Sequence, residues 1–495
     1  MNHSKSWFKD MATSIDTLPL LKDGEEYFSQ SQKALKGIHG EDLLKVAVAP
    51  EIHVQMALPI NKASYYTLQN IPIDEMIDIF CAAGKIFTQD MLINGISTSL
   101  DEWGELITLS TGMPIRYVRN ALNMVPHIFT KTQLRRLLRA NSPTGNLSIF
   151  DDYVGVRGST RFGWSPRGKN VGVGLPGNHP AVSLLGTLIP LFKIPAIIRA
   201  SSSEPFTSFR ICKALWEAGL PHESLFHFVT DHSTTDTIVR QSDLGIIFGN
   251  EWILKAYENN SRIKTFGPGR SKCLIEIEDM TATHLDLAVE LAYQSIHYDG
   301  GRGCINSSGI IYNSPQMYDE FKDKLATKLA SLEPLDPMNP RAEIPAMDPD
   351  KARGMYKMIK SRMTGNVKNL TSEVRGEDEF LTIEDNLAYL MPTLLELDEE
   401  HQMRTDEWPF SFGTICRPDD YLVEELVEHT LSLAYLTDNP TNTRRLLNIP
   451  SIKKVFTNDQ SFTMDISAPH EGYMCDFLYE TKASNFDGTN NILQK

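Results

Sequence analysis

From about residue 145 onward, short apolar runs alternate with longer amphipathic stretches. Runs such as "NVGVGL" and "PAIIRA" are predominantly apolar, which is typical of strands that are buried on both faces. Between two such runs, residues 205–218 place Phe206, Phe209 and Leu215 on one helical face, with a proline at the start and a glycine just past the end. This alternation of strands and helices predicts a parallel, doubly wound α/β sheet.

Other regions of the chain have different patterns. Residues 1–144 show mostly helical, amphipathic periodicity, as in "IDEMIDIFCAAGKIFTQDML", so we expect them to be largely helical. The stretch 145–165 is polar, β-prone and punctuated by glycine, which predicts a hairpin that projects from the body. A second unit of helices and strands begins near Leu285, and the last dozen residues form a polar tail.

Composition narrows the class of protein. A chain of 495 residues can form two or three packed units, and 41% hydrophobic with 22% charged residues is typical of a soluble globular protein. The net charge of −15 argues against a nucleic-acid binder and against an anionic membrane surface as a partner. No apolar run reaches the roughly 18 residues of a membrane span, and the N-terminus lacks the apolar core of a signal peptide.

The six cysteines are scattered along the chain, without a CxxC pair and without a histidine at zinc-ligand spacing. We therefore expect no metal site, no disulfide framework and a cytoplasmic protein with reduced thiols. Cys304 stands apart from the others because it follows three glycines and an arginine in "GGRGCINSSG". Most free cysteines are small buried side chains, so this pattern alone leaves open whether Cys304 is a nucleophile.

A second glycine-rich string, Gly172 to Gly177, matches G-x-G-x-x-G letter for letter. The dinucleotide fingerprint needs a helix that begins at this turn, and an acidic residue further along the chain. Pro176 and Pro180 disfavour the helix start, and Arg199 occupies the neighbourhood of the acidic residue. We therefore expect the turn to serve another purpose.

Several segments resemble motifs of the aldehyde dehydrogenase superfamily. In chain order over roughly residues 145–440 they are "GLPGNHP", "AIIRASSSEP", "GLPHESLFHFVT", "FGNEWILK", "GGRGC", "EPLDP" and "EWPFSFG". The first resembles the family's Pro-x-Asn-x-Pro turn, "GGRGC" its Gly-Gln-x-Cys nucleophile loop, and "EWPFSFG" its Glu-x-Phe-Gly-Pro signature. Because weak matches in the correct order reinforce one another, the resemblance favours Cys304 as a working nucleophile.

The resemblance implies an α/β fold of the aldehyde dehydrogenase type. Its parts are a doubly wound parallel-sheet cofactor domain, an α/β catalytic domain and a β hairpin for oligomerisation. On this chain they would be a helical N-terminal part of the cofactor-binding domain (1–144), the projecting oligomerisation hairpin (145–165), the dinucleotide-binding domain (166–283), the catalytic domain (284–450), and a C-terminal oligomerisation segment with the tail (451–495).

One departure from the family pattern indicates a branch. Hydrolytic aldehyde dehydrogenases carry a glutamate, in a Leu-Glu-Leu-Gly-Gly-Lys segment, that activates the water molecule releasing the acid. The aligned stretch here is "TFGPGRSK", and the glutamate position falls on Phe266. The missing base, the "GGRGC" loop and the long N-terminal region resemble the acyl-CoA reductase branch. The long-chain fatty acyl-CoA reductases that supply aldehyde to bacterial luciferase are members of that branch.

This resemblance implies NADPH-dependent reduction of a long-chain acyl-CoA, or another acyl thioester, to an aldehyde through a cysteine acyl-enzyme. Cys304 would attack as the thiolate, which is the nucleophilic form. The side-chain amide of Asn178 and the backbone N–H of Cys304 would stabilise the oxyanion. Arg302 either adds positive charge near the thiolate or is a structural loop residue.

The resemblance also implies the cofactor residues. In NAD-selective relatives a glutamate in this segment binds the adenosine ribose and would repel a 2′-phosphate. Here the corresponding pair is Arg199 and Ser202, and an arginine can hold a phosphate through two hydrogen bonds, so NADPH is preferred to NADH. Gly249 would pack beside the dinucleotide. Glu407 would hold the nicotinamide ribose, or else is a solvated acidic residue.

Four residues near these motifs have less specific interpretations. His297 and Asp299 precede the cysteine loop, where they either tune the thiol and replace the missing base or simply end a helix. We interpret His179 as structural. Cys273 lies in the alternating run "CLIEIED" and is expected in the core.

Other functions remain open at this stage. They are a hydrolytic NAD(P)-dependent aldehyde dehydrogenase, a reductase of acyl phosphates, and an idle scaffold subunit of an acyl-processing complex. By resemblance, we expect a homo-oligomer formed through residues 145–163 and 451–483. The acyl chain would come from CoA, from a carrier protein or from an acyl-transferring partner protein.

Overall fold

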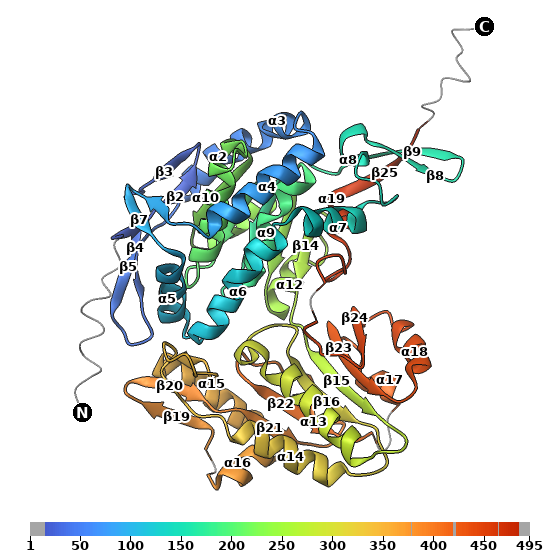
Figure 1. The fold of residues 1–495 in the computed structure, drawn as a ribbon. Coiled ribbons are helices and arrows are strands. Elements are labelled where there is room, and N and C mark those ends of the chain that lie inside the picture. Colours follow the sequence, from blue (N-terminus) through green and yellow to red (C-terminus); the bar gives the residue numbers. More distant parts are fainter. Residues whose placement is uncertain (1–14, 378, 419–421, 464, 485–495) are drawn as a thin grey trace.

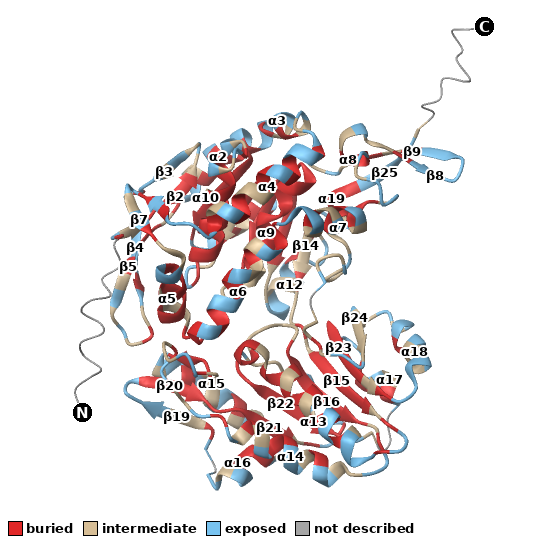
Figure 2. Cartoon of the chain, in the orientation of Figure 1, coloured by how far each residue is buried: buried red, intermediate tan, exposed pale blue. Residues whose placement is uncertain are grey.

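The computed structural model describes residues 15–377, 379–418, 422–463 and 465–484. Two seven-stranded sheets, each packed with helices, form two halves of the chain, and a small three-stranded sheet extends from one of them (Figure 1). Buried residues concentrate on the strands and on the inner helix faces of each half (Figure 2). The expected α/β architecture with two sheet domains and a projecting β element is confirmed.

The first sheet has the strand order β14-β13-β10-β11-β12-β2-β3. The bounds are β14 (Ile263–Phe266), β13 (Leu244–Phe248), β10 (Val171–Gly174), β11 (Ala196–Ala200), β12 (Leu225–Val229), β2 (Leu20–Lys22) and β3 (Glu25–Tyr27). The first five strands are parallel, and β2 joins antiparallel to β12. Helices α10 (Phe206–Glu217) and α11 (His232–Gln241) lie between the parallel strands along the chain, as the alternating pattern predicts.

The second sheet has the order β18-β21-β22-β16-β15-β23-β24. The bounds are β18 (Lys368–Asn369), β21 (Thr393–Glu396), β22 (Phe412–Cys416), β16 (Ser307–Tyr312), β15 (Ser271–Glu276), β23 (Ser432–Thr437) and β24 (Lys454–Thr457). All neighbours pair in parallel except β18, which is antiparallel to β21. Helices α13 (Ala282–His297) and α14 (Tyr318–Ala330) pack against each other beside this sheet. Cys273 is fully buried in β15, as expected.

The division of the chain at residue 283 is wrong for β15. This strand pairs with β16 and β23 and therefore belongs to the second sheet, and β24, from the predicted C-terminal segment, joins the same sheet. Both sheets consist of short apolar parallel strands, so the pattern does not change where the chain passes from one sheet to the other. The passage is the short turn 267–270, between β14 and β15.

The N-terminal region is helical only in part. The helical pattern expected for residues 1–144 holds for α2 (Glu51–Ala63), α4 (Ile73–Phe87), α5 (Leu100–Thr111), α6 (Ile115–Ile128) and α7 (Lys131–Asn141). The expectation is wrong for residues 17–47, which form β1 (Thr17–Leu18), β2, β3, β4 (Gln32–Lys36) and β5 (Asp42–Ala47). These strands of two to six residues are too short to show a clear period in the sequence.

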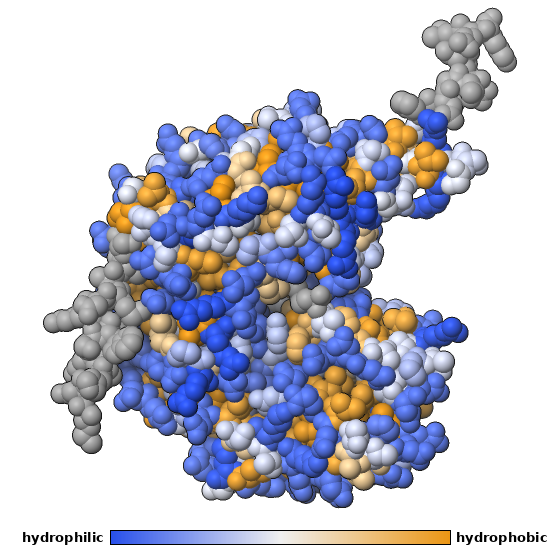
Figure 3. All heavy atoms as spheres, viewed as in Figure 1, coloured by the Kyte–Doolittle hydropathy of each residue, from blue (hydrophilic) through white to orange (hydrophobic). Residues whose placement is uncertain are grey.

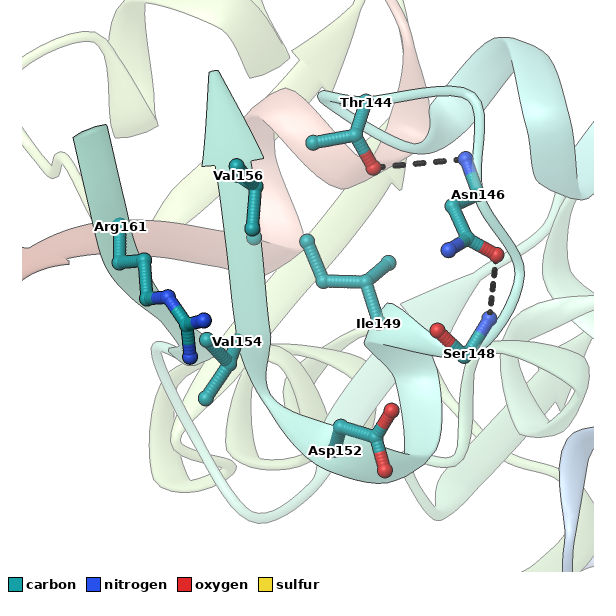
Figure 4. Close-up of a pocket in the computed structure, with 9 residues that line it drawn as sticks. Thr144, Asn146, Ser148, Ile149, Asp152, Val154, Val156 and Arg161 are labelled. Atoms are coloured by element: carbon teal, nitrogen blue, oxygen red, sulfur yellow. Dashed lines mark hydrogen bonds between the residues drawn. The ribbon is translucent and has the colours of Figure 1, made fainter. Parts of the chain in front are cut away.

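The hairpin expected at 145–165 consists of β8 (Val154–Arg157) and β9 (Thr160–Pro166). β25 (Tyr479–Ala483), near the C-terminus, pairs antiparallel with β9, and the Tyr479 ring stacks on Trp164 at 4.0 Å. A surface pocket of about 630 Å³ lies against the hairpin and is lined by residues such as Ile149 and Arg161 (Figure 4). The expected polar tail falls largely on residues 485–495, which lie outside the described residues.

Polar side chains cover most of the face in Figure 3, and a notch separates the two halves at one side of it. In the described part of the chain no helix is long and apolar enough to cross a membrane.

Candidate active site

The loop that carries Cys304 turns sharply after α13. Asp299, Gly300 and Gly301 all have positive φ values, of 50°, 77° and 74°. A side chain at Gly301 would place its Cβ 2.5 Å from the backbone nitrogen of Ser411, so this position has no room for one. Asn306 closes the loop, because its Oδ1 accepts the Gly303 N–H at 2.7 Å and its Nδ2 donates to the Tyr298 carbonyl.

Cys304 itself lies against the turn between the two sheets. Its carbonyl accepts the Ser271 hydroxyl at 2.8 Å. A Cβ atom at Gly269 would lie only 1.6 Å from the same carbonyl oxygen, so the close approach of the two backbones requires glycine there. The passage from β14 to β15 therefore forms one wall of the cysteine loop.

The thiol of Cys304 has an unfavourable setting for ionisation. Its pKa is raised to about 12, and burial is the largest cause. The carboxylates of Glu407 and Glu471 also raise this pKa, whereas the Lys454 ammonium lowers it. The pKa of the Cys273 thiol is also raised to about 12, but by burial alone. The two thiols thus differ in their charged neighbours, and Cys304 has both signs of charge around it.

Asn178 lies beside this loop. It follows β10, and its Nδ2 donates to the Arg302 carbonyl at 3.1 Å, while its Oδ1 is buried without a hydrogen-bond partner in the described structure. The helical turn η1 begins only at Pro180, with the His179 ring accepting the Ala181 N–H. The G-x-G-x-x-G string thus ends in a turn that brings Asn178 to the cysteine loop.

His179 makes a second link between the Asn178 turn and the cysteine loop. Because its Nδ1 accepts the Ala181 N–H, the neutral ring carries its proton on Nε2 and donates to Asp299 Oδ2 at 2.9 Å. The two residues each lie beside a sequence motif, but no local pattern predicts the pair, since 120 positions separate them. Asp299 is therefore engaged in holding the loop on the Asn178 turn.

The contacts of His297 and Arg302 favour structural roles. Both ring nitrogens of His297 have partners, the Ser411 hydroxyl at 2.7 Å and the Tyr117 hydroxyl at 3.3 Å, and burial lowers its pKa to about 4. The Arg302 guanidinium donates to the Thr111 carbonyl at 2.8 Å, at the end of α5. Of the two interpretations of Arg302, the structure supports the loop anchor.

Phe266 ends β14 and is 3% exposed. Its ring stacks on Phe248 at a centroid distance of 4.7 Å, and the His470 ring meets it edge-on at 5.7 Å. The Lys264 ammonium lies 4.9 Å from the ring centroid. An aromatic cluster thus fills the position expected to distinguish the two branches, with Phe266 where the family resemblance implies a glutamate.

Comparison with known proteins decides the family. The model of the aldehyde dehydrogenase family matches residues 30–416, well over half of the chain. The chain belongs to the aldehyde dehydrogenase family. A search of curated protein sequences found no match.

Solved structures share the aldehyde dehydrogenase fold with this chain. The indole-3-acetaldehyde dehydrogenase AldA of P. syringae, in complex with NAD+ and IAA, has a TM-score of 0.76 at 16% identity, over 97% of this chain and 98% of its own. PnpE from Pseudomonas sp. WBC-3 has a TM-score of 0.73 at 17% identity, over 94% and 96%. Aldehyde dehydrogenase 21 from Physcomitrella patens, in complex with succinate, has 0.74 at 16% identity, over 94% and 97%.

The predicted nucleotide residues of this family member lie at the carboxyl ends of first-sheet strands, where doubly wound sheets bind ligands. Arg199 lies in β11, and its Nη2 donates to the Thr230 carbonyl at 3.4 Å while its Nε is buried without a partner in the described structure. Ser202 is exposed just beyond this strand. Gly249 follows β13, where a Cβ would lie 2.5 Å from that of Ile253. An unpartnered arginine nitrogen and an exposed hydroxyl fit a nucleotide's phosphate and ribose.

Two acidic residues that follow Arg199 along the chain were not predicted as site residues. Asp231, the N-cap of α11, is exposed, and its carboxylate raises the pKa of Arg199 while burial lowers it. Because Asp231 lies at the end of the neighbouring strand, only the pairing of β11 with β12 could have revealed it. Glu204, by contrast, faces inward and accepts the backbone and hydroxyl donors of Thr207.

Glu407 lies on the second-sheet side of the site. Its Oε2 accepts the Arg270 N–H at 2.7 Å, and burial raises its pKa. The carboxylate is therefore bonded to the same turn that contacts Cys304 and is not simply solvated. Its expected role toward the nicotinamide ribose stays a prediction.

Proposed function

We propose that this aldehyde dehydrogenase family member uses NADPH to reduce a long-chain acyl-CoA, or a related acyl thioester, to the aldehyde. The observation that carries the proposal is the packing of Phe266 against Phe248 and His470. By the family resemblance, hydrolytic members have a water-activating glutamate at this position. Without that base, a Cys304 acyl-enzyme is protected from water and remains available for reduction.

In the proposed reaction, the Cys304 thiolate bonds to the acyl carbon and the CoA thiolate leaves. The Asn178 amide and the Cys304 N–H stabilise the negative oxygen of each tetrahedral state. When bound, the reduced nicotinamide supplies the hydride. The bond between the carbon and Sγ then breaks, which releases the aldehyde and returns the cysteine as thiolate.

Arg199, Ser202 and Gly249 are the proposed nucleotide residues, with Glu407 at the nicotinamide ribose. Preference for NADPH is supported by the unpartnered Nε of Arg199 and by the absence of a carboxylate at Ser202. The exposed carboxylate of Asp231 acts in the opposite direction, because it would repel a 2′-phosphate at Arg199. The two residues therefore set the balance between NADPH and NADH.

Hydrolytic aldehyde oxidation is the second candidate function. Glu407 and Glu471 both act on the Cys304 thiol electrostatically, so carboxylates other than the missing one lie near the nucleophile. Burial raises the pKa of each, which is a property of general bases. Either residue would have to activate water for this alternative to hold.

The assembly and location of the protein are also proposals. The pairing of β25 with the β8–β9 hairpin leaves two sheet edges, at β8 and β25, that support a homo-oligomeric interface. The six cysteines are free, which supports a cytoplasmic location. An acyl-carrier protein or an acyl-transferring protein is the proposed donor alongside CoA.

The deciding experiment is mass spectrometry of the intact protein and its peptides after incubation with a long-chain acyl-CoA but no nicotinamide. We expect an acyl adduct on the Cys304 peptide, and its conversion to free aldehyde when NADPH is added. Release of fatty acid instead of aldehyde would establish the hydrolytic alternative. An unmodified Cys304 in folded protein, with several chain lengths tried, would contradict the reductase and revive the scaffold role.

A further inference from the structure

Lys454 is linked to the backbone of Cys304 through residues on neighbouring strands of the second sheet. It is the first residue of β24 and pairs in register with Ser432 on β23. The Ser432 N–H donates to Ser271 Oγ at 3.2 Å, and this hydroxyl donates to the Cys304 carbonyl at 2.8 Å. Neighbouring strands lie about 4.8 Å apart, so Lys454 starts two strands from Ser271. From there it interacts electrostatically with the Cys304 thiol.

The Lys454 ammonium points into a group of titratable side chains. Burial lowers its pKa, whereas Cys304 and Glu471 raise it. Among the described residues the ammonium has no hydrogen-bond or ion-pair partner. The other titratable groups facing this space are Glu407, which precedes β22, and His470. Lys264 and Lys453 act electrostatically on Glu471.

The backbone of Glu471 is anchored by a hydrogen bond from Lys264. Its carbonyl accepts the Lys264 ammonium at 2.8 Å, and its carboxylate lies 4.0 Å from His470 Nδ1. Two carboxylates, of Glu407 and Glu471, thus disfavour a negative charge on Cys304. A thiolate in this setting needs a compensating cation, and Arg302 points away toward Thr111.

We infer that Lys454 is the counter-ion that stabilises the Cys304 thiolate. The Sγ–H bond breaks, the proton passes to solvent water, and the thiolate is paired with the Lys454 ammonium. This inference rests on the proposed function only in taking Cys304 as the nucleophile. It assigns a chemical role to the start of β24, which sequence analysis had placed in an oligomerisation segment.

The test is the rate of Cys304 alkylation by iodoacetamide in the full-length protein, followed by peptide mass spectrometry from pH 6 to 9. Because the thiol pKa is about 12, the rate should rise about tenfold per pH unit in every variant. Lys454→Met should slow alkylation about tenfold at each pH, corresponding to about one unit in the thiol pKa. Lys454→Arg should restore most of the rate. Lys453→Met, at the exposed neighbour that acts on Glu471 but not on the Cys304 thiol, should change the rate much less.

A rate for Lys454→Met equal to that of the parent, in protein with an unchanged thermal unfolding curve, would overturn the inference. If Lys454→Met does not fold, Lys454→Gln removes the same charge and is judged by the same criterion. Alkylation needs neither acyl-CoA nor NADPH, so it is independent of the proposed function. If Lys454→Met slows alkylation but the parent protein forms no acyl adduct with acyl-CoA, the counter-ion role is supported and the reductase function is contradicted.

Discussion

The two large sheets contribute to the site from opposite strand ends. The first sheet supplies residues at or beyond the carboxyl ends of its strands, namely Asn178 after β10, Ser202 after β11, Gly249 after β13 and Phe266 at the end of β14. The second sheet supplies residues at or before the amino ends, namely Cys304 before β16, Glu407 before β22 and Lys454 at the start of β24.

This difference explains which residues a sequence can reveal. Ligand sites of doubly wound sheets lie at carboxyl strand ends, so searching there finds the first set. No such rule leads to the amino ends of the second sheet. Cys304 was found only through its glycines and the family motif, and Lys454 begins a strand whose sequence carries no motif.

The largest expected effect is on activity, and it distinguishes two cysteines of the second-sheet half, Cys304 and Cys273. Cys304→Ala removes the nucleophile at the amino end of β16 and should lower acyl-CoA reduction by at least about 10⁴-fold. Cys273→Ala, inside β15, should keep activity within about threefold and cost about 1 kcal/mol of stability. Steady-state kinetics and urea unfolding measure the two quantities. Equal activity losses in both variants would contradict the assignment.

The first-sheet side should show the next largest effect. Asn178→Ala removes an oxyanion donor at the carboxyl end of β10 and should lower kcat about 10²–10³-fold. We expect little change in KM, since the donor acts mainly on the tetrahedral state. Asn260→Ala, at a site remote from the cysteine loop, is the control for general damage. A loss confined to KM would mean that Asn178 only positions the substrate.

Arg302 tests how the cysteine loop is held between the sheets. Arg302→Met removes the hydrogen bond to the Thr111 carbonyl and should lower the free energy of unfolding by about 1.5–3 kcal/mol. Arg119→Met, which removes only an exposed ion pair with Asp101, should change it by less than about 1 kcal/mol. Urea unfolding measures both. An Arg302→Met protein as stable as its parent would show that the anchor is dispensable.

The smallest expected effect concerns cofactor choice at the first sheet. Asp231→Asn keeps a good N-cap for α11 but removes the charge beside Arg199, so the ratio of kcat/KM for NADPH over NADH should rise up to about fivefold. Arg199→Ala should lower the same ratio. If neither variant alters the ratio, the adenosine end of the nucleotide does not contact this pair.

Local patterns were sufficient for much of the fold. The apolar runs at β10, β11 and β12, and the helix bounded by proline and glycine at α10, lie within a residue or two of the expected positions. The short strands at residues 17–47 were missed because two to six residues cannot show a period. β15 was assigned to the wrong sheet because the composition of a strand does not show which strands it pairs with.

The candidate site was predictable only where a motif marks it. The sequence indicated Cys304 and Asn178, and the structure brings them to facing loops. The pair His179–Asp299 and the approach of Asp231 to Arg199 join residues that are distant along the chain. Such contacts depend on the packing of strands and loops, which no local pattern records.

Gly269 limits how this chain can evolve a new activity. Any side chain at this position would displace the Cys304 carbonyl, so a substitution of Gly269 would disrupt the loop that carries the thiol. Phe266, three positions earlier, packs against the side chains of Phe248 and His470, which can repack. A directed-evolution library that seeks a water-activating carboxylate beside the nucleophile should therefore vary Phe266 together with Phe248 and His470, and keep Gly269 constant.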